Sequence, residues 1–208
     1  MISTDCLPSH RLMVANITDV LEAARTAPET FASSCTWYER YRRRLYRLGH
    51  AMGVDTATAV GAFAALSPAC DVDRNMALAR LMLDTNDCRH PHGNAIEKAR
   101  RIRNGEDPTD VLRGDKVCSF YANLMRPRDP GPVTIDRHAL AIAHKRILED
   151  RYARRVMGRK GGYETVADAY REVGANTGLL PCQVQAVTWE HWRTHHSWYA
   201  PNREKVGR

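Results

Sequence analysis

The chain has 208 residues, of which 43% are hydrophobic and 26% charged, and its formal net charge is +7. This length allows one well-buried domain or two lobes that share a cleft, and the mixture of charge and apolar content argues against general disorder. The positive charge favours a polyanionic partner, with nucleic acid as the leading candidate. A basic protein without such a partner would have the same composition, so charge supports this partner but does not establish it.

The cysteines and the N-terminal residues indicate the cellular compartment of the protein. Six cysteines are scattered without a CxxC pair, which argues against a secreted disulfide framework. The first residues lack the basic and apolar segments of an export signal. No apolar run approaches the length that spans a membrane. We therefore expect a cytoplasmic protein with reduced thiols and no membrane association.

Helical periodicity recurs along the chain while strand signals are weak, so the sequence predicts an all-α fold. The expected helices cover 11–25, 36–52, 56–66, 73–83, 94–103, a short segment from Asp107, the residues after Gly114, the residues after Asp136, 163–174 and 181–194. The expected connections are polar loops at 86–93 and 127–132 and a flexible basic break at 158–162. Residues 1–196 are expected to form the folded domain, and residues 197–208 a loose tail.

Start and stop signals support several of these boundaries. Asp73 can cap the helix that runs to about Leu83, and Pro108 suits the first position of a short helix. Asn104 and the glycine after it can end the basic helix before them. Residues 56–66 are rich in alanine and apolar on nearly every side, which predicts a buried helix.

The strongest functional signal is a glycine turn followed by two helix starts. Gly114 opens a helix with Lys116 on its first turn, and twenty residues after that lysine Asp136 opens the next helix. Backbone N–H groups at such a turn, together with the positive end of the helix, bind phosphate without base contacts. The same helix end disfavours extra positive charge on Lys116, so a partly neutral amine could attack a sugar carbon.

A carboxylate close to such an amine can activate it or a water molecule, and can stabilise the positive charge that develops as a glycosidic bond breaks. Asp136 is the candidate for that role. Each residue also has a simpler interpretation: an aspartate before a helix is most often only a cap, and a lysine on a first turn is commonly a solvated side chain. The catalytic interpretation rests on their occurrence together with the glycine turn.

These segments resemble the helix-hairpin-helix (HhH-GPD) DNA glycosylases of the endonuclease III and MutY type. Residues 112–118 resemble that family's LPGVGRKTA hairpin, shortened around the turn, and residues 135–139 resemble its VDTHV segment. Upstream, residues 65–69 with Asp71 and Asn75 are similar to an LLSAQ segment followed by aspartate and asparagine, and residues 94–99 resemble the helix before the hairpin. The resemblance covers roughly residues 56–150.

The resemblance implies a two-lobed helical fold with a cleft between the lobes, a helix-hairpin-helix around residues 107–124, and a target nucleotide flipped out of double-stranded DNA. Lys116 matches the lysine that forms a Schiff base in bifunctional members, and Asp136 matches the catalytic aspartate. The expected DNA-binding residues are Ser67, Arg74, Asn75, Arg113, Gly114, Asp115, Arg137 and His138. We expect a monomer that recognises a damaged or modified base and uses no cofactor.

Three departures from the family pattern leave the reaction open. The hairpin lacks its first proline and glycine, with Arg113 in their place, and Ala69 replaces the glutamine that follows the family's Leu-Ser. The four-cysteine iron–sulfur motif is absent, since Cys182 is the only cysteine after Cys118. Phage-encoded relatives of this fold are assigned to tailoring of hypermodified pyrimidines. A base-modifying transferase and a non-catalytic DNA-binding module are therefore the alternatives to a glycosylase.

Other motifs have simpler interpretations. Cys88, His90 and His92 are spaced too tightly for an ordinary zinc site, and His191 with His195 lacks a third ligand, so we expect no metal. The arginines at 40, 43, 44 and 47 are solvated or face phosphates, with tyrosines among them that could stack on bases. Trp189 and Trp192 are expected to be packing residues, and Gln183 and Gln185 could read base edges.

Overall fold

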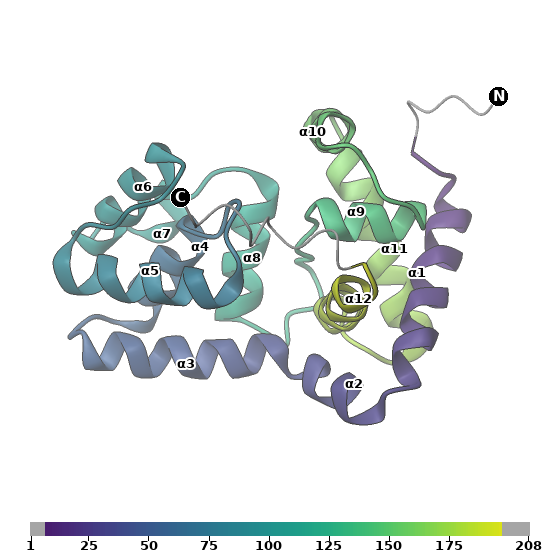
Figure 1. The fold of residues 1–208 in the computed structure, drawn as a ribbon, viewed down its shortest axis with the longest axis horizontal. Coiled ribbons are helices and arrows are strands. Elements are labelled where there is room, and N and C mark those ends of the chain that lie inside the picture. Colours follow the sequence, from purple (N-terminus) through teal and green to yellow (C-terminus); the bar gives the residue numbers. More distant parts are fainter. Residues whose placement is uncertain (1–6, 197–208) are drawn as a thin grey trace, which may run out of the picture. The chain divides into compact units, whose positions relative to one another are not determined.

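The computed structural model describes residues 7–196, which form twelve helices and no strand (Figure 1). The prediction of an all-α fold is confirmed. The helices belong to two compact units: unit 1 combines the N-terminal part up to Cys35 with the part from Ile135 onward, and unit 2 runs from Thr36 to Thr134. The tail expected at 197–208 lies outside the described residues. None of the helices within 7–196 combines the length and the apolar character needed to cross a membrane.

Unit 2 is built around one buried helix. Its helices are α3 (Trp37–Ala51), α4 (Thr56–Ala65), α5 (Val72–Thr85), α6 (Gly93–Arg103), α7 (Pro108–Val111) and α8 (Asp115–Met125). In α4 every residue from Ala59 onward is buried, as its apolar composition predicts, and α3, α5, α6, α7 and α8 pack around it (Figure 1). Asp55 caps α4 by accepting a hydrogen bond from the backbone N–H of Thr58 at 2.6 Å. The apolar helix therefore forms the scaffold of this unit.

A close approach between α4 and α7 fixes the short helix of the hairpin. A Cβ atom added at Gly61 would lie 2.8 Å from Cγ of Pro108, closer than real Cβ contacts, so only glycine allows this distance. Pro108 itself is buried at the first position of α7. The start of the hairpin is therefore held directly against the core of unit 2.

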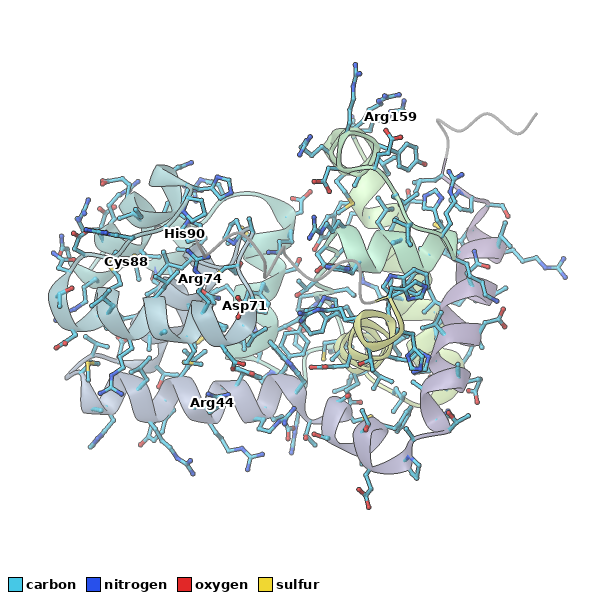
Figure 2. The ribbon with its side chains drawn as sticks, viewed as in Figure 1. Arg44, Asp71, Arg74, Cys88, His90 and Arg159 are labelled. Carbon is cyan, nitrogen blue, oxygen red and sulfur yellow. The ribbon has the colours of Figure 1, made fainter. Side chains whose placement is uncertain are left out.

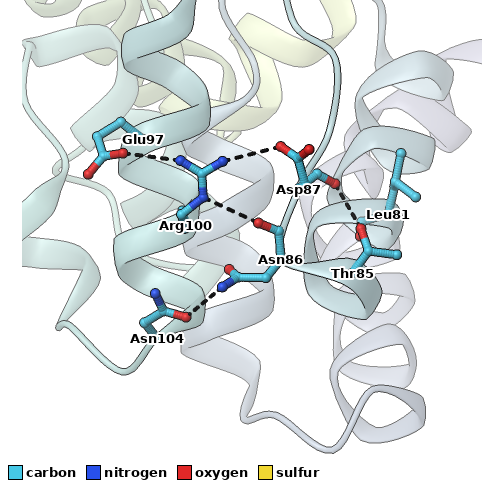
Figure 3. Close-up of polar contacts among 7 residues, drawn as sticks. All are labelled: Leu81, Thr85, Asn86, Asp87, Glu97, Arg100 and Asn104. Carbon is cyan, nitrogen blue, oxygen red and sulfur yellow. Dashed lines mark hydrogen bonds and ion pairs between the residues drawn. The ribbon is translucent and has the colours of Figure 1, made fainter.

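The connection between α5 and α6 is tied to both helices by polar contacts (Figure 3). Arg100 on α6 donates to the backbone carbonyl of Asn86 at 3.3 Å and to the carboxylate of Asp87 at 3.2 Å. The side-chain amide of Asn86 donates to Asn104 at 3.0 Å. Thr85 closes the end of α5 by donating to the carbonyls of Leu81 and Asp87. The loop predicted at 86–93 is thus anchored at its first residues.

The start of α5 differs from the sequence expectation. Asp71, not Asp73, is the cap, and its carboxylate accepts a hydrogen bond from the backbone N–H of Arg74 at 3.0 Å. Asp73 lies instead in the first turn, where a negative charge also suits the positive helix end. Either Asp71 or Asp73 could cap the helix as far as the sequence shows, and the structure has Asp71 as the cap.

Unit 1 is built around its first and last helices, which pack against each other and against three of the other helices. Its helices are α1 (His10–Arg25), α2 (Pro28–Cys35), α9 (Arg137–His144), α10 (Asp150–Gly158), α11 (Gly162–Thr177) and α12 (Pro181–His195). Residues 138–143 of α9 are all buried, and α1, α10 and α12 pack against that helix. The helices α2 and α10 were not predicted. The break expected at 158–162 is a short turn, closed by a hydrogen bond from Gly162 N–H to the Arg159 carbonyl at 2.9 Å.

Polar contacts hold α9 at both ends and in the middle. Before the helix, the backbone N–H of Ile135 donates to the Tyr163 hydroxyl at 3.0 Å. Within it, the buried hydroxyl of Tyr170 donates to the carbonyl of Ala139 at 3.2 Å. At its end, the Asn16 side chain donates to the carbonyl of Ala143 at 2.9 Å. The residue that precedes α9, Asp136, is therefore attached to one of the most firmly held elements of unit 1.

Candidate nucleic-acid hairpin and carboxylate site

In the region where the sequence predicts the hairpin, residues 107–124, the chain forms α7, a three-residue turn and α8. Asp107 caps α7 by accepting from the backbone N–H of Thr109 at 2.8 Å, and Leu112 is buried beneath the turn. Gly114 caps α8 with φ of 89° and ψ of 132°, a conformation that is essentially restricted to glycine. No atom lies within 4 Å of a Cβ placed there, so backbone conformation and not space requires the glycine.

The backbone of this turn presents its N–H groups as a helix N-terminus does. The Gly114 carbonyl accepts from the N–H groups of Val117 and Cys118. The N–H groups that precede them in the first turn have no intrahelical acceptor and point along the helix axis, which is the geometry that binds phosphate. Arg113 and Asp115 are both exposed beside the turn. Arg113 folds back onto its own hairpin, donating to the carbonyls of Thr109 and Leu112.

Lys116 and Ser67, predicted from separate motifs, are brought together. The Lys116 ammonium donates to the Ser67 hydroxyl at 3.2 Å, although the two residues are 49 positions apart. Its Nζ lies 5.9 Å from the centre of the Phe120 ring, on the next turn of α8. The residue is half-buried, and the hydrogen bond to Ser67 orients its side chain.

The Asp136 carboxylate is held by three hydrogen bonds. Its Oδ1 accepts from the backbone N–H groups of His138 at 2.9 Å and Ala139 at 2.8 Å, so the residue is the predicted cap of α9. Its Oδ2 accepts from the indole N–H of Trp189 on α12 at 3.1 Å. A carboxylate offers about four lone-pair positions, so one acceptor position is left for another donor. The group is half-buried, oriented and still able to accept a proton or a hydrogen bond.

Trp189, predicted to be a packing residue, also makes a polar contact: its ring lies edge-on to His138 while its indole N–H binds Asp136. The residue is half-buried, and the Arg193 guanidinium lies 4.4 Å from its ring centre. Trp192, by contrast, is buried as predicted. The two tryptophans are three residues apart, and the sequence alone does not indicate which of them faces Asp136.

The other predicted DNA-binding residues lie in different surroundings. Arg74 is exposed near the start of α5 (Figure 2). Asn75 is 2% exposed and donates to the Phe63 carbonyl at 3.0 Å, so it links α5 to α4 inside unit 2. Arg137 is exposed and forms an ion pair with Asp150 at 3.3 Å. His138 is buried, and burial lowers its pKa despite the opposing influence of Asp136.

The remaining sequence motifs have structural roles. No group of three or more His, Cys, Asp or Glu side chains within residues 7–196 could hold a metal ion. Cys88 is buried, while His90 lies in the loop with its Nδ1 close to the backbone N–H of His92 (Figure 2). Gln183 caps α12 by accepting from Leu180 N–H, and Gln185 is 5% exposed. The glutamines therefore belong to the packing of unit 1.

The candidate residues thus form one group in each unit. Unit 2 holds Gly114, Lys116 and Ser67, and unit 1 holds Asp136 with Trp189. The structure therefore defines an all-α protein with two helices joined by a glycine turn in one unit and an ordered carboxylate in the other.

The chain belongs to DUF7178, a family of unknown function whose model matches residues 3–196. No curated protein and no solved structure matches the chain.

Proposed function

We propose that the protein is a DNA glycosylase with lyase activity, which flips a damaged or modified base out of double-stranded DNA and excises it. The proposal includes the two-lobed HhH-GPD-like arrangement of the fold, a monomeric state and a place of action in the cytoplasm. The observation that carries it is the hairpin of α7 and α8, in which a glycine-only conformation precedes a helix with a lysine on its first turn.

The hairpin supplies the sequence-independent part of DNA binding. The turn at Gly114 and the first turn of α8 direct N–H groups toward solvent, and the helix dipole adds partial positive charge. The net charge of +7 favours association with DNA in general. Asp115 is exposed at the same turn and would repel a phosphate, so its contribution comes from the backbone N–H.

Asp136 supplies the negative charge that base excision requires. As the bond between the base and the sugar C1′ breaks, positive charge develops on the sugar, and a fixed carboxylate stabilises that charge more than a mobile one does. The hydrogen bonds from His138, Ala139 and Trp189 fix the group before substrate arrives.

Lys116 is the proposed nucleophile. Its neutral amine forms a bond to C1′ while the bond from C1′ to the base breaks, and the electron pair of that bond leaves with the base, which takes up a proton from water. The new C1′ ammonium loses a proton to water and O4′ gains one as the sugar ring opens, which gives an iminium between C1′ and Nζ. Loss of a C2′ proton then expels the 3′ phosphate and breaks the strand, and water hydrolyses the iminium and releases the lysine. Ser67 accepts a hydrogen bond from Nζ and thereby directs the amine.

The test is base release from duplexes that carry a panel of damaged and phage-type modified bases, followed by mass spectrometry of the free base. Borohydride added during the reaction reduces the iminium and traps a covalent adduct. Trapping is expected for the wild type and is expected to disappear in Lys116→Ala. Lys98→Ala, which removes a half-buried lysine of α6 in the same unit, serves as the matched control and should trap normally.

The alternatives give different products in the same assay. A transferase that modifies a flipped pyrimidine would release no base and would change the mass of the DNA strand. A non-catalytic module would bind DNA, release no base and leave the mass of the DNA strand unchanged. Its DNA affinity would be the same in Asp136→Asn as in the wild type. Either result would overturn the glycosylase proposal.

A further inference from the structure

The exposed side of α3 is an arginine surface. The helix contains five arginines and one glutamate, and Arg40, Arg43, Arg44 and Arg47 recur at the spacing of a single helical face. All four are exposed, and Figure 2 shows Arg44 on α3, whereas Trp37, Tyr38 and Leu45 are buried. Tyr46 is 57% exposed beside this row. The buried side explains the packing of α3 on α4 and α8, but packing does not explain five arginines.

The loop that follows α8 adds arginines to the same surface. A hollow that is open to solvent is lined by Glu39, Arg42, Arg43 and residues 126–129. Residues that line the hollow form two ion pairs: Arg128 with Glu39 at 3.2 Å, and Arg126 with Asp129 at 3.3 Å. Four guanidinium groups face two carboxylates, so the hollow keeps an excess of positive charge. Arg128 is 85% exposed and its single ion pair is screened by water, which makes the pair easy to exchange for a phosphate.

The hollow is connected to the hairpin through α8. Arg42 donates to the carbonyl of Met125, the last residue of α8, at 3.1 Å, whereas the hairpin turn lies at the first residue of the same helix. A helix of 11 residues is about 16 Å long, which corresponds to about five base pairs of duplex rise. The helix α8 therefore has the turn proposed to bind phosphate at its first residue and the arginine cluster of the hollow at its last.

We propose that the arginine surface, formed by Arg40, Arg43, Arg44 and Arg47 of α3 with Arg42, Arg126 and Arg128 of the hollow, is a second binding site for the DNA backbone. It contacts phosphates about five nucleotides away from those bound at the hairpin. This inference rests on the proposed function, since it assumes that the hairpin binds DNA.

Two features favour a nucleic-acid backbone as the occupant. The arginines of α3 span residues 40–47, about 11 Å of helix, and Arg126 and Arg128 of the loop extend the surface further, which suits a polymer of regularly spaced charges better than one small anion. Its guanidinium groups are forked donors that match phosphate oxygens, and the exposed hydroxyl of Tyr46 adds a neutral donor of the kind that contacts phosphate. Glu39 then acts as the group that Arg128 exchanges when DNA binds.

The test is the salt dependence of binding to an undamaged 20-base-pair duplex, measured by fluorescence anisotropy. The double variant Arg43→Gln/Arg128→Gln removes one charge from α3 and one from the loop. Each lost phosphate contact should reduce the slope of log affinity against log salt by about 0.9, so we expect a decrease of about 1–2 and roughly tenfold weaker binding at low salt. Arg43→Lys/Arg128→Lys keeps the charges and should restore most of the slope.

Arg11→Gln/Arg80→Gln is the matched control, because it removes two exposed arginines, on α1 and α5, with the same change in net charge. The inference fails if the slope of the Arg43/Arg128 variant equals that of the control. Gly114→Asp, measured in parallel, separates this failure from failure of the proposed function. If the wild type does not bind the duplex, both proposals are wrong. If Gly114→Asp loses affinity for the duplex while Arg43→Gln/Arg128→Gln does not, only the proposal of the arginine surface is wrong.

A positional readout completes the test. Single phosphates in one strand are replaced by neutral methylphosphonates, one position at a time, and the affinity of each duplex is measured. At some phosphate positions the replacement should weaken binding of the wild type but not of Arg43→Gln/Arg128→Gln. These positions should lie about five nucleotides from the positions at which the replacement no longer affects Gly114→Asp. If both variants become insensitive to the same positions, the arginine surface is no separate site.

Discussion

The indole N–H of Trp189 donates a hydrogen bond to Oδ2 of Asp136 at 3.1 Å, which links α12 to the residue that starts α9 across 53 positions of sequence. The other carboxylate oxygen is held by the backbone of α9 itself. The two contacts together fix both the position and the rotation of the group. A carboxylate that only caps a helix needs the backbone contacts alone, so the indole contact goes beyond capping and is the contact to test.

Trp189→Phe keeps an aromatic ring and removes the N–H. A hydrogen bond to a charged group contributes about 1.5–3 kcal/mol, so the rate of base release should fall roughly 10- to 100-fold. Affinity for undamaged DNA should not change, because backbone binding is assigned to unit 2. Trp192→Phe, the same substitution at a buried position of α12, is the control and should release base at the wild-type rate. Equal rates in both variants would show that the contact only packs α12 against α9.

Asp136→Asn and Asp136→Ala separate capping from chemistry. Asparagine caps helices about as well as aspartate, whereas alanine costs about 1 kcal/mol of helix stability. Urea unfolding should therefore show a lower free energy of unfolding for the alanine variant than for the asparagine variant. Both should lose base release, because neither carries the negative charge. An asparagine variant that retains full activity would reduce Asp136 to a helix cap.

Gly114→Ala tests the backbone of the hairpin. Forcing a side chain into this positive-φ conformation costs about 1–3 kcal/mol, and the turn relaxes by moving its N–H groups. Binding should weaken to the same extent for duplexes of unrelated sequence, since phosphate contacts carry no sequence information. Gly93→Ala, at an open position without positive φ, is the control. A change in sequence preference at constant affinity would contradict the assignment of the hairpin.

Gly61→Ala tests whether core packing positions the hairpin. The new methyl group would meet Pro108 at 2.8 Å, and overpacking of this kind costs about 1–3 kcal/mol. We expect a lower midpoint of urea unfolding, and weaker DNA binding at concentrations of urea where the protein is still folded. Gly158→Ala, which meets no atom within 4 Å, should leave both unchanged. Normal DNA binding by a destabilised Gly61→Ala would mean that α7 need not be held at this distance.

Stability should depend on pH through His144, a half-buried histidine of unit 1. Burial, with a smaller effect of Arg146, lowers the pKa of His144 to about 4 from its ordinary value of 6.5. The unfolded chain therefore binds more protons than the folded one between these values, and stability present above pH 6.5 is lost as the pH falls toward 4. Urea midpoints at pH 7 and pH 5 measure this loss. The decrease should be smaller in His144→Gln, and an equal decrease would assign the pH dependence to other groups.

Much of the fold follows from local sequence, and the failures have identifiable causes. Residues 56–66 predict a buried helix because apolar side chains surround it on all sides, and α4 confirms this. The helix α10 escaped prediction because its many arginines conceal the apolar stripe of Tyr152, Ala153 and Val156. Only backbone geometry distinguishes Asp71 from Asp73 as the cap of α5.

The candidate site divides in the same way. The local part, with Gly114 at the turn and Asp136 at the cap of α9, was predictable because it depends on neighbouring residues. The contacts of Lys116 with Ser67 and of Asp136 with Trp189 join positions 49 and 53 residues apart. Such contacts are set by how helices pack, and helix periodicity does not specify which half-buried side chain meets which partner.

The most direct measurement of the central claim is single-turnover release of free base, quantified by mass spectrometry, for the wild type and Asp136→Asn on the duplexes of the panel. Our account predicts release from at least one modified duplex by the wild type and at least a 100-fold slower rate for Asp136→Asn, with DNA affinity unchanged. Intact strands of unchanged mass for every duplex, or equal rates for the two proteins, would contradict it.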